Sequence, residues 1–304
     1  MSDVERRLRV AVLGSGQIGT DLAIKLSKHD EFEIKVVAGR RGNSPGLDFV
    51  SKRKIATSTQ GIQTILDLGD EIDLVFDCTS ASDHKIHWPL LKRAGISAID
   101  LTPAKLGIFY IPNVTPPITF QFGEPVNINL VTCGGQSASP LVHAIKQVAR
   151  IARIEVASNI ASLSAGPATR ANIDEYLATT EDVLLKISGA AEAKAILVLN
   201  PAEPPITMQN TLYFSLMDHE STSEALLNDA ISTAIRGIQK YVPGYRSAMK
   251  SSFVQNEFVV SVLVKGRGDY LPAYSGNLDI INSTAIEAAL EFATALHSQE
   301  SFGG

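Results

Sequence analysis

The feature that most constrains the fold is a short apolar run that ends in a glycine-rich turn and continues as a helical pattern. Leu8 to Leu13 is a nearly uninterrupted run of strand type, typical of a central parallel strand that is buried on both faces. The G-x-G-x-x-G pattern Gly14-Ser15-Gly16-Gln17-Ile18-Gly19 follows, and then apolar residues recur at helical spacing. Strand, glycine turn and helix in this order are the context that a dinucleotide-binding turn requires. A plain tight turn is the alternative, and we favour dinucleotide binding.

Each glycine of this turn has a physical role in such a site. Gly14 permits the tight turn, Gly16 lets the backbone approach a pyrophosphate, and Gly19 lets the helix pack on the strand. The first N–H groups of the helix, together with its dipole, favour phosphate at this point. The sequence therefore predicts that these three glycines belong to a cofactor site.

Three further apolar segments continue the pattern, FEIKVVAG, EIDLVFDCTS and ISAIDLTP, with helical stretches between them. Strands that alternate with helices indicate a doubly wound parallel sheet of the Rossmann type. The second strand of such a sheet normally ends in an acidic residue that binds the ribose of NAD. Here it ends in Gly39-Arg40-Arg41. Arg40 can seat the 2′-phosphate of NADP, but two solvated loop arginines are an equally good interpretation, so the choice between NAD and NADP stays open.

Composition narrows the class of protein. The chain has 304 residues, of which 45% are hydrophobic and 19% charged, as in ordinary globular proteins. A formal net charge of -5 gives no indication of a nucleic acid or an anionic membrane as partner. No apolar run approaches the roughly 20 residues that span a bilayer, and the charged N-terminus is unlike a secretory signal. We therefore expect a cytoplasmic protein that binds neither nucleic acid nor membranes.

The two cysteines and the nearby histidines differ in their settings. The chain shows neither a CxxC nor an HExxH spacing, so we expect no metal site. Cys78 follows the strand DLVFD and can lie near the cofactor, but packing as a small hydrophobe is the favoured interpretation. His84 and His87 begin a helix, where we expect them to be partly exposed and without a catalytic role.

Cys133 stands where ligands meet a doubly wound sheet, at the end of the segment NINLVT. The segment GGQSASPLVHAIKQVARIA then reads as a helix, with Pro140 in its first turn and Ser137 or Ser139 as its cap. A thiol beside a helix N-terminus has its thiolate favoured by the dipole and by free N–H groups, which can also hold an oxyanion. A dinucleotide and a cysteine nucleophile together predict aldehyde oxidation through a thiohemiacetal, with an inert buried thiol as the alternative.

A second domain follows the nucleotide domain. The segments RIEVASNIAS, AKAILVLN, TLYFSLM and EFVVSVLVKG read as strands, and EALLNDAISTAIRGIQKYV reads as a helix between them. Long strands with mixed helices predict an α+β domain that builds the substrate pocket and a dimer surface. We place the dinucleotide-binding domain at residues 1–133, completed by a C-terminal helix at 277–304, and the α+β catalytic and dimerisation domain at 134–276.

Several long segments resemble one family over practically the whole chain. NLVTCGGQ, SAGPATRANIDEY, GAAEAKAILVLNPAEPP, YVPGYR and LPAYSGNLDI are similar to the acylating acetaldehyde dehydrogenases. Those enzymes are the partners of 4-hydroxy-2-oxovalerate aldolases in meta-cleavage pathways of aromatic or sterol catabolism. The resemblance implies that acetaldehyde or propionaldehyde is oxidised with NAD, or with NADP because of Arg40, and that the acyl group passes to coenzyme A. It also implies a homodimer within a heterotetramer that contains the aldolase.

The resemblance carries over residue by residue. Cys133 is implied to be the acyl-thioester nucleophile, and Asn277 matches an asparagine near the nicotinamide. Ser15, Gly16, Gln17 and Ile18 match the first cofactor segment of the family. The second cofactor segment corresponds to Ser164, Ala165, Gly166, Pro167, Ala168, Thr169, Arg170, Ala171 and Asn172. From its residues alone, this second segment is a loop of small side chains that a ligand can approach closely.

The sequence departs from the family pattern at three positions. An acidic residue is usual where Arg40 stands, and a glycine is usual where Ala168 stands. Asn210 occupies the catalytic position of an aspartate that is thought to act as the base, and an amide cannot accept a proton at neutral pH. Either Cys133 is acidified by its surroundings, or another group such as Glu203, His143 or Asp218 serves, or activity is low.

Two other functions remain compatible with these residues. The nearer one is another cysteine-dependent Rossmann reductase of the semialdehyde or acyl-phosphate type, with phosphate instead of coenzyme A as the acyl acceptor. The more distant one is a dinucleotide-binding protein with impaired catalysis, and Asn210 would then be the sign of that loss.

Overall fold

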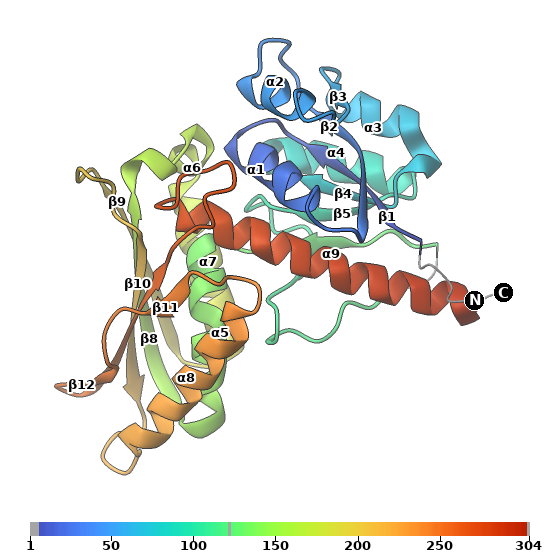
Figure 1. The fold of residues 1–304 in the computed structure, drawn as a ribbon. Coiled ribbons are helices and arrows are strands. Elements are labelled where there is room, and N and C mark those ends of the chain that lie inside the picture. Colours follow the sequence, from blue (N-terminus) through green and yellow to red (C-terminus); the bar gives the residue numbers. More distant parts are fainter. Residues whose placement is uncertain (1–5, 121–122, 303–304) are drawn as a thin grey trace. The chain divides into compact units, whose positions relative to one another are not determined.

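The chain forms two compact units, one built on a parallel sheet and the other on a mixed sheet. The computed structural model describes residues 6–120 and 123–302, except for the side chains of Pro167, Ala168 and residues 299–302. The first unit comprises residues 1–110, 116–130 and 284–304, and the second comprises residues 111–115 and 131–283 (Figure 1).

The first unit holds a seven-stranded parallel sheet with the order β3-β2-β1-β4-β5-β7-β6. Its strands are β1 (Leu8–Leu13), β2 (Phe32–Ala38), β3 (Thr57–Ser58), β4 (Leu74–Asp77), β5 (Ser97–Asp100), β6 (Ile108–Phe109) and β7 (Asn127–Asn129). Its helices are α1 (Gln17–Leu26), α2 (Pro45–Ser51), α3 (Ile62–Leu68), the 3-10 turn Gly69–Glu71 and α4 (Ala81–Arg93). Helices connect the parallel strands from β1 to β5, as the alternating sequence pattern predicts.

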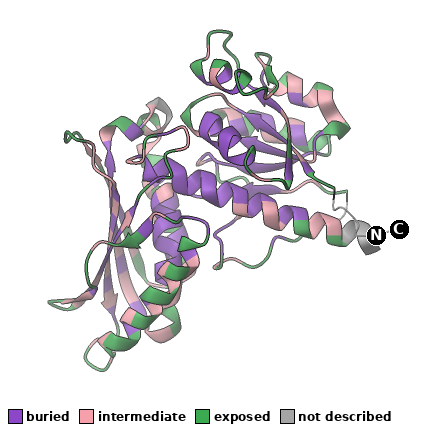
Figure 2. Cartoon of the chain, in the orientation of Figure 1, coloured by how far each residue is buried: buried purple, intermediate pink, exposed green. Residues whose placement is uncertain are grey.

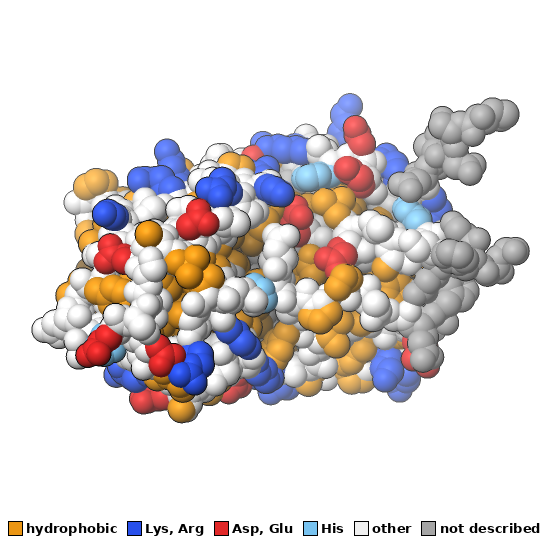
Figure 3. Space-filling view, turned by 90° about the horizontal axis from the view of Figure 1, so that it is seen from below, with side chains coloured by type: hydrophobic (Ala, Val, Ile, Leu, Met, Phe, Trp, Pro, Cys, Tyr) orange, Lys and Arg blue, Asp and Glu red, His pale blue; other side chains and the backbone are white. Residues whose placement is uncertain are grey.

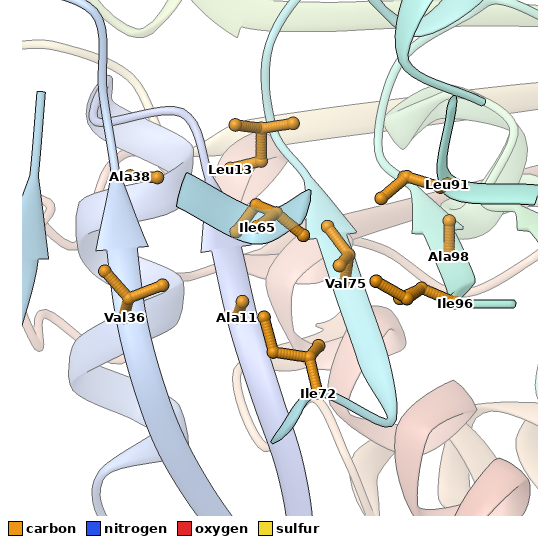
Figure 4. Close-up of a cluster of buried hydrophobic side chains, with 10 residues drawn as sticks. All are labelled: Ala11, Leu13, Val36, Ala38, Ile65, Ile72, Val75, Leu91, Ile96 and Ala98. Carbon is orange, nitrogen blue, oxygen red and sulfur yellow. The ribbon is translucent and has the colours of Figure 1, made fainter. Parts of the chain in front are cut away.

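Both faces of this sheet are covered. Alternate residues of β1, Ala11 and Leu13, lie on one face in a cluster with Ile65 of α3 and Leu91 of α4 (Figure 4). The other face belongs to α1, since a Cβ atom at Gly19 would lie 3.3 Å from the Val12 side chain. Successive strand residues point to opposite faces, so helices lie on the two sides of the sheet. Figure 2 shows these strands as buried over most of their length.

The second unit holds a six-stranded mixed sheet with the order β11-β13-β10-β8-β9 and with β12 paired to β13. Its strands are β8 (Ile151–Ala161), β9 (Glu192–Asn200), β10 (Met208–Leu216), β11 (Tyr245–Ser247), β12 (Ser252–Val254) and β13 (Glu257–Val264). Its helices are α5 (Cys133–Val148), the 3-10 turn Ser162–Ser164, α6 (Pro167–Ala171), α7 (Ile173–Ser188) and α8 (Glu224–Gln239). Only β8 and β9 pair in parallel within this sheet, with α7 as their connection.

One face of this second sheet packs against helices. Burial alternates along the strands, so that Ile154 and Val156 of β8 and Leu212 and Phe214 of β10 are buried while the residues between them are not (Figure 2). Helices α5 and α7 contact this sheet, and α8 packs on α5 (Figure 1). The predicted fold class, a doubly wound parallel sheet with a second α+β domain, is therefore confirmed.

The last helix, α9 (Gly276–Phe302), begins in the second unit and belongs to the first unit from Thr284 onward. Within the first unit, Phe292 stacks on Phe120 with ring centroids 4.8 Å apart, and Glu291 accepts a hydrogen bond from the Tyr110 hydroxyl at 2.8 Å. Among the described residues, no helix is both long and apolar enough to cross a membrane. Acidic and basic side chains are interspersed over the face seen in Figure 3.

Candidate active site

Cys133 is the first residue of α5. Thr132 caps this helix, because its side-chain oxygen accepts a hydrogen bond from the amide of Gly135 at 2.9 Å. The predicted cap at Ser137 or Ser139 is wrong, and Pro140 lies inside the helix and not in its first turn. The structure starts the helix earlier because threonine is itself a good cap and the two glycines tolerate helical geometry. The thiol consequently lies directly at the helix N-terminus.

Two groups contact the Cys133 thiol region. Tyr176 of α7 brings its hydroxyl oxygen 3.6 Å from Cys133 Sγ, and the amide of Gly134 donates to the same oxygen at 3.1 Å. Burial raises the pKa of the Cys133 thiol, while the Tyr176 hydroxyl and the first backbone N–H groups lower it. The net shift is upward, because the effect of burial on the pKa exceeds that of the hydroxyl and the backbone N–H groups. Cys133 as a whole residue is half-buried.

The amides that were expected to hold an oxyanion are already engaged. The N–H of Gly134 donates to Tyr176, and the N–H of Gly135 donates to the Thr132 cap. The hydroxyl of Tyr176 therefore occupies the place next to Cys133 that free backbone donors were predicted to fill.

Cys78, the other thiol, is in a setting that disfavours reaction. Burial and the neighbouring carboxylates of Asp77 and Asp100 raise the pKa of Cys78 well above its ordinary value. The backbone of Cys78 packs against the glycine turn, where a Cβ atom at Gly14 would lie 2.8 Å from the Cys78 carbonyl oxygen. Its position supports the packing role.

Asn210 of β10 reaches the backbone that follows Cys133. Its Nδ2 donates to the carbonyl oxygen of Gly134 at 3.3 Å, and its side chain is fully buried. Its Oδ1 is buried without a hydrogen-bond partner among the described residues. The structure thus brings Asn210 and Cys133 together through the Gly134 peptide.

None of the three suggested replacement bases has a described contact with the Cys133 sulfur. Asp218 forms an ion pair with Arg150 at 2.8 Å on the surface. His143 lies on the more exposed side of α5 beside Gln147, and Glu203 is exposed in the loop after β9. No described contact brings any of the three to the sulfur, so the sequence-based list of substitutes finds no support.

The second cofactor segment and Asn277 meet within the second unit. Asn277 Nδ2 donates to the carbonyl oxygen of Ser164 at 3.4 Å, and the Asn277 side chain is 2% exposed. Arg170 ties the loop to itself through the carbonyl oxygens of Ala165 at 3.0 Å and Ser162 at 2.9 Å. Gly166, Thr169, Ala171 and Asn172 belong to the same turn and short helix, whereas the side chains of Pro167 and Ala168 lie outside the described residues.

The glycine turn of the first unit has the shape that a dinucleotide requires. Gly14 adopts φ +114°, which side-chain-bearing residues rarely adopt, and Gly19 packs so closely that a Cβ atom there would lie 2.0 Å from the Gly14 carbonyl oxygen. A Cβ atom at Gly16 would meet no atom within 4 Å, so the space beside it is open to a phosphate. Ser15, Gln17 and Ile18 lie in this turn and the first turn of α1. The residues fit a dinucleotide cofactor.

Arg40 lies at the end of β2, beside the glycine turn. A Cβ atom at the adjacent Gly39 would lie 2.5 Å from Ser15 Oγ, so the two segments are in contact. The Arg40 guanidinium forms two hydrogen bonds of 3.0 Å with the carboxylate of Asp83 at the start of α4. Arg40 is therefore already paired with a carboxylate of the protein, that of Asp83.

A buried polar cluster that the sequence did not reveal lies at the ends of β4, β5 and β7. Oδ2 of Asp77 is 2.9 Å from His84 Nδ1 and 2.8 Å from His87 Nδ1, and both histidines are buried. The expectation that His84 and His87 are partly exposed is wrong. Both imidazoles are buried because the buried Asp77 carboxylate needs hydrogen-bond donors, which the two histidines supply. Asp100, Asn127 and Asn129 complete the cluster.

Tyr176 is the residue beside Cys133 that the sequence analysis did not single out. It lies in the segment SAGPATRANIDEY, but only the residues before it were assigned to a site. The usable signal is the buried face of α7, on which Tyr176 and Thr180 recur at a spacing of four residues. Thr180 Oγ1 lies 2.7 Å from Thr132 Oγ1, so this face of α7 packs against the start of α5.

Two family models match the chain. The model described as semialdehyde dehydrogenase, NAD binding domain, matches residues 9–106, and the model described as prokaryotic acetaldehyde dehydrogenase, dimerisation, matches residues 133–272. The first contains the glycine turn and Arg40. The second contains Cys133, Tyr176 and Asn210.

Full-length relatives give the same result. An acetaldehyde dehydrogenase of Pectobacterium atrosepticum is 45% identical over 287 residues, which cover 94% of this chain and 96% of the relative. One of Desulfitobacterium hafniense is 43% identical, covering 95% and 96% of the two chains, and one of Spirochaeta aurantia is 46% identical, covering 96% and 97%. At this identity over almost the entire length, the chain belongs to the acetaldehyde dehydrogenase family.

Proposed function

We propose that the protein is an acylating aldehyde dehydrogenase that oxidises acetaldehyde or propionaldehyde with NAD and transfers the acyl group to coenzyme A. The observation that carries this proposal is the position of Cys133, a half-buried cysteine that is the first residue of a helix in a chain of this family. Its contact with a hydroxyl group and with the Gly134 backbone is the setting of a nucleophile, and Cys78 has no equivalent.

The covalent steps that we assign to this chain take place on the sulfur of Cys133. The Cys133 thiolate attacks the carbonyl carbon, so that a C–S bond forms, the C=O π bond breaks, and the oxygen takes a proton from water to give a thiohemiacetal. Oxidation removes a hydride from carbon and releases the hydroxyl proton to water, which leaves the acyl group on Cys133 as a thioester. The thiol of coenzyme A gives its proton to water and attacks the thioester carbon, the C–S bond to Cys133 breaks, and Cys133 leaves as a thiolate. A bound nicotinamide dinucleotide supplies the hydride acceptor.

Two segments of the chain are proposed to bind the cofactor. In the proposal, Gly14, Ser15, Gly16, Gln17, Ile18 and Gly19 bind the pyrophosphate end, and the segment Ser164 to Asn172 with Asn277 serves the nicotinamide end. NAD is the proposed cofactor because Asp83 neutralises Arg40. Use of NADP would require Arg40 to exchange Asp83 for a 2′-phosphate.

The direct test is reduction of the dinucleotide by the purified protein. Acetaldehyde and propionaldehyde are supplied with NAD or NADP, with and without coenzyme A, and Cys133→Ala and Cys78→Ala run in parallel. We expect coenzyme-A-dependent reduction that disappears in Cys133→Ala and persists in Cys78→Ala. Absence of reduction with every aldehyde, although the dinucleotide binds, would contradict the proposal and favour a binding protein in which Asn210 impairs catalysis.

A second candidate follows from the semialdehyde dehydrogenase model that matches residues 9–106. A reductase of that type would use phosphate as the acyl acceptor. The same assay distinguishes it, because replacement of coenzyme A by phosphate would then sustain turnover. The second unit matches the prokaryotic acetaldehyde dehydrogenase model, and this match favours coenzyme A over phosphate as the acyl acceptor.

Wider assignments extend the proposal. We propose a homodimer built by the second unit, which matches the dimerisation model. By analogy with the family resemblance, a 4-hydroxy-2-oxovalerate aldolase would join it in a heterotetramer in the cytoplasm and deliver the aldehyde during aromatic or sterol catabolism. Co-purification of the two chains and their sedimentation as one complex is the measurement for this partner.

A further inference from the structure

Tyr176 reaches from α7 to the N-terminus of α5, where it meets the nucleophile and the peptide after it. Its hydroxyl oxygen lies 3.6 Å from Cys133 Sγ and 3.1 Å from the amide nitrogen of Gly134. The side chain is 8% exposed, and Thr180, one turn later, anchors α7 by its 2.7 Å contact with the Thr132 cap. The hydroxyl is therefore held beside the sulfur by the packing of two helices.

Gly134 makes this approach possible. A Cβ atom at position 134 would lie 2.3 Å from the Tyr176 hydroxyl oxygen and 2.7 Å from Ser158 Oγ. Both distances are far inside van der Waals contact, so any side chain would displace the phenol from the sulfur. The glycine that follows Cys133 leaves room for a hydroxyl group from another element.

The chemistry of the hydroxyl suits a donor to sulfur. A tyrosine hydroxyl has one proton to donate and lone pairs that accept. Burial raises the pKa of Tyr176 well above its ordinary value, and negative charge on Cys133 raises it further. The phenol keeps its proton at neutral pH, so this proton can be donated to a thiolate. The Gly134 N–H donates to the phenol oxygen and thereby strengthens its O–H as a donor.

Among the described residues, the other side chains that face this pair are neutral. Ser158 of β8 and Asn210 of β10 are cross-strand partners on the helix-facing side of the sheet. Asn210 cannot take up the thiol proton, and its hydrogen bond to the Gly134 carbonyl oxygen holds the peptide whose N–H meets Tyr176. Asn210 is a positioning residue in this arrangement. The titratable groups that meet here are Cys133 and Tyr176.

We propose that Tyr176 is a catalytic residue that stabilises the Cys133 thiolate through an O–H···S hydrogen bond. On ionisation the S–H bond breaks and its proton passes to solvent water, while the O–H bond of Tyr176 stays intact and turns toward the sulfur. When the acyl group departs, Cys133 again becomes a thiolate and is stabilised by the same donor. This inference rests on the proposed function, which makes that thiolate the nucleophile.

The test measures the reactivity of the Cys133 thiol and does not depend on enzymatic turnover. In a Cys78→Ala background, the rate of Cys133 alkylation by iodoacetamide is followed from pH 6 to 10. Tyr176→Phe keeps the ring and removes only the hydroxyl. We expect alkylation of this variant to be about tenfold slower at pH 7, because a hydrogen bond to a charged group is lost. The two rates should draw closer toward the upper end of this range, as the thiol of the parent approaches full ionisation.

Tyr245→Phe is the matched control. Tyr245 is also fully buried, and its hydroxyl donates to the Ser137 carbonyl oxygen of the same helix at 2.7 Å. Loss of that hydroxyl should leave the alkylation profile unchanged. Circular dichroism checks that both variants fold.

The outcomes separate the two proposals. A Tyr176→Phe profile that coincides with that of the parent, or an equal shift in Tyr245→Phe, would overturn the role of Tyr176. A shift specific to Tyr176→Phe supports it. If that specific shift is seen but no aldehyde reduces the dinucleotide, the thiolate-stabilising role stands and the proposed enzymatic function fails.

Discussion

Arg40 carries a guanidinium that already has an anion beside it. Two hydrogen bonds of 3.0 Å join it to Asp83, although its side chain is 69% exposed. A pair this exposed stabilises the fold by at most about 1 kcal/mol. Its larger consequence is electrostatic, because the Asp83 carboxylate both occupies Arg40 and repels the 2′-phosphate that distinguishes NADP from NAD.

Asp83→Asn should therefore shift the cofactor preference toward NADP. We expect the ratio of kcat/KM for NADP to that for NAD to rise about fivefold, the factor that corresponds to about 1 kcal/mol. The measurement is steady-state reduction of each dinucleotide at saturating aldehyde. Arg40→Ala in the Asp83→Asn background is the control and should abolish the gain. An unchanged ratio would show that Arg40 is a solvated loop residue with no part in recognition.

Strand β4 and helix α4 are joined by a buried carboxylate. Burial alone would raise the pKa of Asp77, but hydrogen bonds from His84, His87 and Thr79 lower it well below its ordinary range. His84 also faces Asp100, whose pKa burial raises to about 6. Asp77 therefore acts as the acceptor that fixes α4 against the ends of β4 and β5.

Asp77→Asn should destabilise the first unit by about 3 kcal/mol at pH 7, since two buried imidazoles lose their anionic partner. Trp88 of α4 is the single tryptophan of the chain and packs against the core of that unit, so its fluorescence reports unfolding there. Asp48→Asn, which removes an exposed ion pair with Lys52 at 2.6 Å, is the control and should cost less than about 1 kcal/mol.

The parent and Asp77→Asn also allow a test of how stability depends on pH, and the direction of the expected change is fixed. The folded pKa of Asp77 is depressed, so its stabilisation is present above about pH 4, the pKa of an unfolded aspartate, and is lost as the pH falls below it. The difference in unfolding midpoint between the parent and Asp77→Asn should shrink between about pH 4 and pH 2. A difference that stays constant over this range would contradict an ionised Asp77.

Local signals explain which elements the sequence predicted. The strand, turn and helix around Gly14 are contiguous, so their pattern is visible without tertiary information. The start of α5 was misplaced because Thr132, Ser137 and Ser139 are all acceptable caps, and only packing decides among them. Tyr176 lies 43 residues from Cys133, and His84 is buried by Asp77 of a different element. Such contacts depend on how helices pack, which no local pattern encodes.

Within the part of the chain that the structure describes, no helix of the second unit packs on the other face of its sheet. On that face lie Ala157 and Asn159 of β8, Val198 of β9, and Thr211 and Tyr213 of β10, which alternate with the helix-facing residues. These side chains are half-buried or exposed, and Val198 is 43% exposed. This face carries small, apolar and uncharged polar residues, with the ion-paired Arg153, Glu155 and Glu257 toward one end. Because it lies in a segment that matches a dimerisation model, it is the surface on which we place the two-fold contact.

Val198→Arg should therefore weaken dimerisation. In a two-fold interface the substitution occurs twice, and each arginine would leave a charge buried without a partner, which costs several kcal/mol. We expect the parent to sediment at twice the chain mass of 32.6 kDa and the variant at that mass at micromolar concentration. Leu226→Arg, on the exposed side of α8, introduces the same side chain on the helical layer and should remain dimeric. If Val198→Arg stays dimeric while Leu226→Arg dissociates, the contact lies on the helical layer, and the open sheet face is left for another partner.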